Sequence, residues 1–304
     1  MNNLIDGRYS PISLLGQGGF GHVYLMEDVV TGSRVALKML ANASVDAVER
    51  FRREARILNA IAGNMHVVQI LMFNMAHSPP YIVTEYCEGG SLRTWVGNRN
   101  WKMTAGAIAH ACVGLSVLHS AGGFHRDLKP DNMLVSPVGG GGVLIKLADF
   151  GLARRPLMSD SPMTRHGAGT NGYIAPEVLA GAEYQSSADV YSLGIVAAEL
   201  LTGERSARLL NDVQMPAKMR ALILDMLSQV PTARPTAAAV AASLNLLLTS
   251  PPPAVQSSDS GMSGLWAGGL LVGGLLLALA AFSGGTGGGA GGGGGGAGGG
   301  GGGA

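Results

Sequence analysis

The segment His125–Asn132, which reads His-Arg-Asp-Leu-Lys-Pro-Asp-Asn, constrains this chain more than any other feature of its sequence. It places the carboxylate of Asp127, the ammonium of Lys129 and the amide of Asn132 close together along the chain. A second acidic motif, Asp149-Phe150-Gly151, follows about twenty residues later. Residue types at these offsets suit phosphoryl transfer, whereas a chance polar turn does not account for both motifs. We call the first segment the catalytic loop and the second the metal loop.

A glycine-rich motif lies far upstream of both loops. Residues 16–23 read Gly-Gln-Gly-Gly-Phe-Gly-His-Val and stand between short runs of β-type residues. Glycine lets the backbone approach phosphate oxygens closely and adopt φ values that other residues resist. A dinucleotide-binding unit carries a similar motif but requires a helix directly after the glycines. Here a second strand follows, and Val35–Lys38 is an apolar strand that ends in a lysine, so the dinucleotide interpretation is rejected.

With these motifs the chain resembles the eukaryotic-like (Hanks-type) Ser/Thr protein kinases over roughly residues 7–248, and it is most like the bacterial members with a single transmembrane span. The resemblance implies an α+β, bilobal fold with a small β-rich N-lobe (1–87) and a larger α-helical C-lobe (88–248). It also implies an enzyme that transfers the γ-phosphoryl group of ATP to Ser/Thr hydroxyls of proteins.

The resemblance assigns a role to each polar residue of the two loops. Asp127 would accept the proton of the attacking hydroxyl, and Lys129 would neutralise charge on the moving phosphoryl group. Asn132 and Asp149 would hold Mg²⁺, with Mn²⁺ as a possible substitute, against the triphosphate.

Lys38 is expected to pair with the α- and β-phosphates, and Glu54 is the carboxylate expected to orient it. Apolar residues at three- and four-residue spacing predict a helix over Asp46–Ile61 that carries Glu54. On this helix Leu58 would stack towards His125 and Phe150. Alternatively, Glu54 belongs only to a charged helix surface, where exposed pairs contribute little.

The strand Tyr81–Cys87 is expected to form the hinge between the lobes. By resemblance, Thr84 is the gatekeeper, Glu85 offers its carbonyl and Cys87 its amide to the adenine, although the apolar residues around it could be plain core. The full set of expected ATP-binding residues is Leu15, Gly16, Gln17, Gly18, Gly19, Phe20, Gly21, Val23, Ala36, Lys38, Thr84, Glu85, Cys87 and Leu134.

A polar stretch from Arg154 to Gly172 matches an activation segment that changes between ordered and disordered states. Thr164 is the first candidate for regulatory phosphorylation, followed by Ser161 and Ser159, and Arg126 would pair with the phosphate. Alternatively, Thr164 is a solvated loop hydroxyl. By resemblance, Thr170 would bond Asp127 and Lys129 and help to seat the substrate hydroxyl.

The rest of the C-lobe is expected to be scaffold. A helix that begins near Asp189 is apolar nearly all round, and Asp189 would cap it and brace the catalytic loop. Arg234 is the expected buried partner of Glu177. Further helices are predicted near 103–119, 217–228 and 236–248.

Composition narrows the class of partner. The formal net charge of +1 argues against a dedicated nucleic-acid surface. The two cysteines, Cys87 and Cys112, have no metal-ligand spacing and suggest no disulfide framework, which fits a reducing cytosol. Met1–Asp6 lacks the basic start and apolar stretch of a signal peptide.

Beyond residue 248 the character of the sequence changes. We expect a Pro/Ser-rich linker (249–261), a transmembrane helix (262–282) and a disordered Gly-rich tail (283–304). Residues 265–282 carry no polar side chain and would form a helix of about 27 Å, close to the hydrocarbon thickness of a bilayer. An apolar low-complexity tail or a docked helix is the alternative.

This tail sets the expected location. The protein would be a single-pass membrane protein with a cytoplasmic kinase domain, because ATP is cytosolic, and with its C-terminus outside. Gly264-x-x-x-Gly268 and Gly269-x-x-x-Gly273 allow a homodimer, although chance explains such spacing in a glycine-rich segment.

Two other functions were weighed. A pseudokinase-type membrane scaffold should have lost the lysine or the metal-binding aspartate, yet Lys38 and Asp149 are both present. A small-molecule phosphotransferase should lack Ala175-Pro176-Glu177 and the Thr170 region that bind polypeptide, and both are present.

Overall fold

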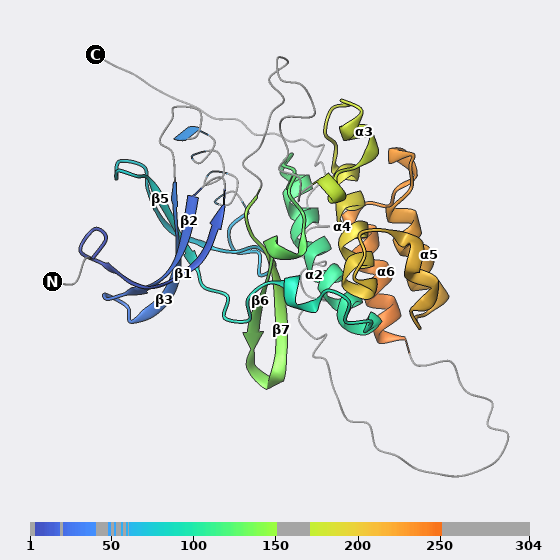
Figure 1. Ribbon diagram of the computed structural model, residues 1–304, viewed down its shortest axis with the longest axis horizontal. Helices are drawn as coiled ribbons and strands as arrows, with labels where there is room; N and C mark the ends of the chain where they lie inside the picture. Colours follow the sequence, from blue (N-terminus) through green and yellow to red (C-terminus); the bar gives the residue numbers. More distant parts are fainter. Residues whose placement is uncertain are drawn as a thin grey trace, which may run out of the picture. The chain divides into compact units, whose positions relative to one another are not determined.

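Five antiparallel strands form the N-lobe in the computed structural model (Figure 1). They pair in the order β1-β2-β3-β5-β4. Their bounds are Tyr9–Gly18 (β1), Gly21–Asp28 (β2), Ser33–Leu40 (β3), Ile70–Asn74 (β4) and Tyr81–Glu85 (β5). Since side chains alternate between the two faces of a strand, the register decides which residues share a face. Val23 lies opposite Lys38, and Ala36 lies opposite Thr84, so these four side chains project from one face of the sheet.

The structure describes residues 4–18, 21–40, 61–150 and 171–250, together with five helical residues between 48 and 59. Those five are Val48, Glu49, Arg52, Arg56 and Asn59, and they agree with the helix predicted over Asp46–Ile61. Glu54 and Leu58 lie outside the described residues.

The opposite face of the sheet carries its own apolar core. Tyr9, Met26, Leu37, Tyr81 and Val83 are buried together there. Lys38 and the other residues of the first face therefore stand on strands whose opposite side chains are packed in this core. Removing this face from water makes the sheet a rigid support for the residues that project from the other side.

The described residues of the C-lobe form five α-helices and one β-hairpin (Figure 1). The helices are Trp101–Ser120 (α2), Pro176–Leu179 (α3), Ser186–Thr202 (α4), Ala217–Met226 (α5) and Ala237–Thr249 (α6), and the hairpin strands are Met133–Val138 (β6) and Gly142–Leu147 (β7). Short 3₁₀ helices span Leu92–Trp95, Pro130–Asn132, Gly139–Gly141, Asn171–Tyr173, Ala207–Asp212 and Pro231–Ala233. This β-rich and α-rich division fits the expected α+β, bilobal fold.

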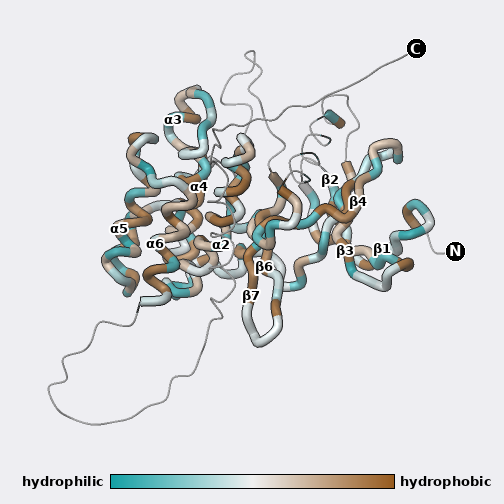
Figure 2. The backbone as a smooth tube through the Cα atoms, turned by 180° about the vertical axis from the view of Figure 1, so that it is seen from behind, coloured by the Kyte–Doolittle hydropathy of each residue, from teal (hydrophilic) through white to brown (hydrophobic). Residues whose placement is uncertain are grey.

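The predicted helices near 103–119, 217–228 and 236–248 correspond to α2, α5 and α6. Polar residues fix where two of them begin. The side chain of Asn100 accepts hydrogen bonds from the first turn of α2, and that of Thr236 accepts one from Ala239 at the start of α6. Apolar and polar stretches alternate along α5, as expected for a helix with one buried face (Figure 2).

Helix α4 is the centre of the C-lobe. Thirteen of its seventeen residues are buried, which confirms the prediction of a helix that is apolar nearly all round. It contacts α2 on one side and α5 on another. The prediction that Asp189 caps this helix was wrong. Gln185 holds the cap position, and the Asp189 carboxylate accepts stronger tertiary donors from the catalytic loop instead.

Among the described residues, α2 is the one helix long and apolar enough to cross a membrane by length and composition. It packs against α4, α6 and β7, so it serves as a core helix of the C-lobe. The predicted transmembrane helix (262–282) and Gly-rich tail (283–304) lie outside the described residues, as does all of the predicted linker after Ser250, the residue that follows α6.

Candidate active site

The catalytic loop brings its three predicted polar residues into direct contact. Lys129 Nζ lies 2.9 Å from Asp127 Oδ2, and Asn132 Nδ2 donates to the same oxygen at 2.9 Å. Asn132 Nδ2 also donates to the backbone carbonyl of Asp127 at 2.8 Å. Because charge-assisted hydrogen bonds restrict rotation, the Asp127 carboxylate is fixed in orientation. It can therefore accept a proton from a hydroxyl placed beside it.

The buried carboxylate of Asp189 supports this loop by hydrogen bonds, as the sequence predicts. Its carboxylate accepts the backbone N–H groups of His125 at 2.9 Å and Arg126 at 3.0 Å, and it is also bonded by His119 and the Tyr184 hydroxyl. Burial would raise the pKa of this carboxyl, but these donors outweigh burial and keep its pKa below the usual value. Arg126 has a φ of 68°, a left-handed conformation that such a support has to stabilise.

His125 connects the catalytic loop to the metal loop. Its Nε2 lies 3.1 Å from the carbonyl oxygen of Ala148, and its Nδ1 accepts the N–H of Asp127. Burial lowers the pKa of His125, so the ring is neutral and can donate at one nitrogen while accepting at the other. The ring also packs on Phe150, with centroids 4.8 Å apart. One buried side chain therefore holds the two loops together.

Lys38 and Asp149 meet although 111 residues separate them. The ammonium of Lys38 donates to Asp149 Oδ1 as a salt bridge. Burial would raise the pKa of Asp149, but the charge of Lys38 outweighs burial and lowers it. Asp149 also has a left-handed φ of 52°. The contact brings the strand lysine to the metal loop, whereas Glu54, the predicted partner of Lys38, lies outside the described residues.

The oxygen donors present fit a hard divalent cation. Asn132 uses its amide N–H₂ group on Asp127, and the Asp149 carboxylate remains about half exposed. Hard cations such as Mg²⁺ favour one or two protein oxygens together with water and substrate phosphates. Within the described part of the chain, no cluster of three or more His, Cys, Asp or Glu residues could hold a metal ion.

The expected nucleotide-binding residues line the first face of the sheet and the hinge. Val23, Ala36 and Thr84 share that face with Lys38, and Leu134 approaches from β6, where it bridges Ser91. A Cβ atom at Gly16 would meet no atom within 4 Å, so a phosphate has room to approach there. Leu15, Gln17, Gly18 and Gly21 lie beside it on β1 and β2, whereas Gly19 and Phe20 lie outside the described residues.

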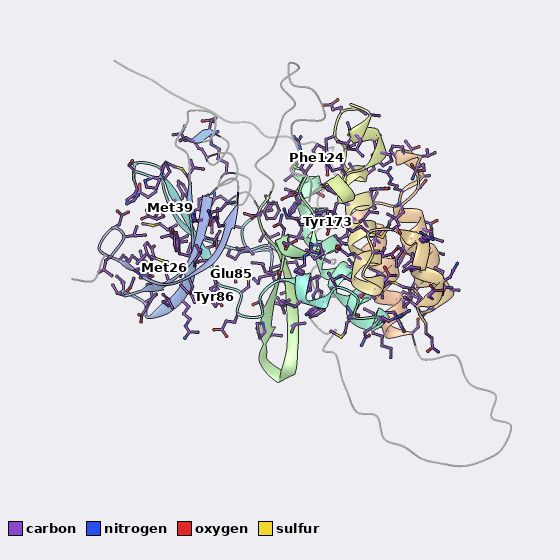
Figure 3. All side chains as sticks on the ribbon, viewed as in Figure 1. Met26, Met39, Glu85, Tyr86, Phe124 and Tyr173 are labelled. Carbon is purple, nitrogen blue, oxygen red and sulfur yellow. The ribbon has the colours of Figure 1, made fainter. Side chains whose placement is uncertain are left out.

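The hinge is fixed by a side chain whose role the sequence analysis missed. Glu85 Oε1 accepts the N–H of Gln69 at 2.8 Å and lies 2.8 Å from Lys146 Nζ on β7. Glu85 thus joins the N-lobe to the strand that leads into Asp149 (Figure 3). A lysine within the apolar strand Val143–Leu147 was the available signal, because a buried ammonium needs a partner. Cys87 follows in the hinge; burial raises the pKa of its thiol to about 11.

Glu177 and Arg234 form the predicted buried pair. Arg234 donates Nη1 and Nη2 to the two carboxylate oxygens of Glu177 at 2.6 and 2.8 Å. Its other contacts are the carbonyl oxygens of Ser187 and Ser228 and the ring face of Tyr191. This fork between Arg234 and Glu177 anchors α3 to the start of α4 and to the segment that precedes α6.

The predicted phosphorylation candidates Ser159, Ser161 and Thr164 lie outside the described residues, as does Thr170, the residue predicted to seat the substrate hydroxyl. Arg126 is described. Its guanidinium lies 5.7 Å from the ring centroid of Phe124 and 5.3 Å from that of Tyr184. A surface pocket of about 600 Å³ borders the start of α2 and the residues before α5, and it contains none of the predicted site residues.

Comparisons with known proteins agree with this geometry. The protein kinase domain family model matches residues 9–244. The serine/threonine-protein kinase Pkn1 of Myxococcus xanthus is 38% identical over 208 residues, which cover 65% of this chain and 29% of that protein. Serine/threonine-protein kinase A of Synechocystis sp. is 30% identical over 272 residues, which cover 76% of this chain and 51% of that protein. The chain thus spans about half, or less, of the length of these curated relatives.

Proposed function

The chain belongs to the protein kinase family, and from this membership we propose that it is a Ser/Thr protein kinase, which transfers the γ-phosphoryl group of ATP to Ser/Thr hydroxyls of proteins. One observation carries the proposal. The ammonium of Lys38 meets Asp149, and His125 ties that loop to Asp127 and its two side-chain donors. Groups from three distant stretches therefore converge where one nucleotide can bind.

In the proposed reaction, the substrate hydroxyl oxygen bonds to the γ-phosphorus while the bond to the β,γ-bridging oxygen breaks and ADP leaves. Asp127 accepts the hydroxyl proton, in the orientation that Asn132 fixes. Lys129 compensates negative charge on the transferred group, and Lys38 holds the nucleotide phosphates. A divalent cation, Mg²⁺ in this proposal, would be held by Asn132 and Asp149 and would neutralise phosphate charge.

The same proposal extends to the residues around the nucleotide. Val23, Ala36 and Leu134 would enclose the adenine, Thr84 would limit the depth of the pocket, and the backbone of Glu85 and Cys87 would bond the base. The shared face of the sheet supports the first part of this arrangement. Residues 16–21 would cover the phosphates.

We further propose that the kinase domain (1–248) is anchored in a membrane by residues 262–282, with a cytoplasmic kinase domain, an outer C-terminus and a possible homodimer. The uncharged stretch 265–282 supports this part of the proposal. Flotation of the full chain with liposomes, compared with a variant lacking 262–282, tests it. If both fail to float, the anchor is refuted.

Activation by phosphorylation in trans at Thr164, Ser161 or Ser159 completes the proposal. Arg126 would pair with the phosphate, as guanidinium groups do. Mass spectrometry of the full chain after incubation with Mg-ATP should locate phosphate within 154–172. Modification exclusively elsewhere would refute this step.

The central test of function is the identity of the acceptor. Full chain purified in detergent is incubated with ATP and Mg²⁺ or Mn²⁺, using casein and myelin basic protein as acceptors. We expect phosphoserine or phosphothreonine in hydrolysates of at least one protein. Transfer to neither protein nor to the chain itself would contradict the proposal, as would transfer to tyrosine alone.

A further inference from the structure

A single arginine connects the catalytic loop to the helical core of the C-lobe. Arg93 stands on the short helix Leu92–Trp95, and its Nη2 lies 2.5 Å from Asp131 Oδ2, with Nε at 3.2 Å from both oxygens. Its Nη1 donates to Glu199 Oε1 on α4 at 2.9 Å. Nη2 also donates to the Tyr173 hydroxyl, which in turn donates to Glu199 Oε2. One guanidinium therefore holds two carboxylates and a phenol.

This cluster lies within reach of a bound substrate. Asp131 is four residues after Asp127 and directly precedes Asn132, so its Cα lies at most ~15 Å from that of Asp127. An extended peptide advances about 3.3 Å per residue. A side chain within about four residues of the phosphoacceptor can therefore approach Asp131. Tyr173 belongs to the same cluster, because its hydroxyl bonds both Arg93 and Glu199.

The exposure of the charges matters for substrate choice. The side chains of Arg93 and Asp131 are 40% and 46% exposed, so both are accessible to a peptide, whereas Glu199 is 6% exposed. Without Arg93, the two carboxylates would attract a cationic substrate residue. Arg205 lies 3.9 Å from Glu199 and 5.4 Å from the Tyr173 ring, so a second positive charge stands beside the same carboxylate.

We propose that Arg93 is a specificity-determining residue. It occupies the carboxylates of Asp131 and Glu199, so the enzyme gains nothing from arginine or lysine within about four residues of the phosphoacceptor. The substrates are then proteins whose acceptor Ser or Thr is not selected by basic residues in the neighbouring sequence. The inference rests on the proposed kinase function and specifies its substrate class.

The test compares peptides in the full-length enzyme. A neutral peptide with one acceptor is set against a series in which a single arginine occupies each of the four positions on either side. For the wild type, kcat/KM of every arginine peptide should stay within about threefold of the neutral peptide. For Arg93→Met, which keeps an apolar stem but removes the charge, at least one position should gain about tenfold.

Three variants serve as controls for this result. Arg99→Met removes an exposed arginine that donates to the carbonyl of Asp212, and it should behave like wild type. Arg93→Lys keeps the charge and should keep most of the wild-type profile. Adding Asp131→Asn to Arg93→Met should reduce the new preference. The KM for ATP should stay within about twofold throughout, because no nucleotide-binding residue is changed.

An independent variant decides the matter if Arg93→Met does not fold. Asp131→Asn alone leaves an excess positive charge, so it should favour a peptide series carrying single aspartates by about threefold or more over wild type. Unchanged peptide ratios in an active Arg93→Met enzyme, or in Asp131→Asn, would overturn the inference. A wild type that already favours one arginine position tenfold would do so too. Absence of transfer to every peptide and protein would instead refute the proposed function itself.

Discussion

Arg234→Leu should unfold the C-lobe far more easily than its position outside the active site suggests. Arg234 is fully buried and donates two hydrogen bonds to Glu177 and one each to the carbonyls of Ser187 and Ser228. Leucine fills part of the volume but leaves the Glu177 carboxylate, 18% exposed, and both carbonyls without these donors.

The magnitude follows from that loss. Removing one partner of a buried ion pair typically costs about 3–5 kcal/mol, because the other charge stays unpaired. For a domain of this size, each kcal/mol shifts Tm by about 2–4 °C, so we expect a decrease of roughly 6–20 °C. Against a total stability of about 5–15 kcal/mol, this is a large fraction.

The difference should also depend on pH in a defined direction. The hydrogen bond from Arg234 lowers the pKa of Glu177 below the ordinary value of a glutamate carboxyl. A carboxyl with a lowered folded pKa contributes stability that is complete above its unfolded pKa and is lost as the pH falls through its folded pKa. The stability gap between wild type and Arg234→Leu should therefore be constant above about pH 5 and shrink below about pH 4.5.

Urea denaturation of both proteins at pH 7.5 and pH 4 measures this gap directly. Arg208→Leu is the matched control, because this surface arginine should change stability by no more than about 0.5 kcal/mol. A loss below about 1 kcal/mol at pH 7.5 would show that the fork is not a stabilising element. A gap that widens in acid would refute the linkage.

Three further predictions concern contacts elsewhere in the structure. In urea denaturation, Glu85→Gln should destabilise the chain by about 1–3 kcal/mol, and by more than Lys146→Met does. The first variant leaves a buried ammonium without its counter-charge, whereas the second leaves a carboxylate that is 27% exposed. Equal losses of stability in the two variants would contradict this asymmetry. Gly114→Ala should lower the free energy of unfolding by about 1–3 kcal/mol in the same assay, although alanine has the higher helix propensity. The reason is that the new Cβ would lie 2.8 Å from the backbone oxygen of His66. An unchanged stability would refute the tight packing at this position. Burial raises the pKa of Cys87 to about 11, so its thiol should react slowly with iodoacetamide at pH 8. Mass spectrometry should show alkylation at least about tenfold slower in the folded chain than in urea. Equal rates would contradict the burial of Cys87.

Sequence motifs located the candidate catalytic residues because their spacing is local. Asp127, Lys129 and Asn132 lie within one loop, and the structure closes that loop with their own hydrogen bonds. The Glu177–Arg234 pair was also anticipated, because both residues stand in recognisable short motifs. Helix bounds agreed closely where a polar cap such as Asn100 marks the start.

The remaining contacts join residues that no local pattern relates. Glu85 and Lys146 are 61 residues apart, and Arg93 and Glu199 are 106 apart. A lysine in an apolar strand and a glutamate in an apolar helix do indicate that partners exist, because buried charges must be compensated. They do not indicate which residues the partners are. Asp189 illustrates the converse error, since local rules favoured a helix cap and tertiary donors prevailed.

The transfer rate of Asp127→Asn tests the central claim most directly. Asparagine keeps the size and hydrogen-bonding shape of the side chain but cannot accept the proton of the hydroxyl, so kcat should fall by at least about a hundredfold. Melting temperature and the KM for ATP should stay near wild type, and the surface variant Asp225→Asn should retain full activity. Transfer by Asp127→Asn at the wild-type rate would show that the converging side chains are not the catalytic centre.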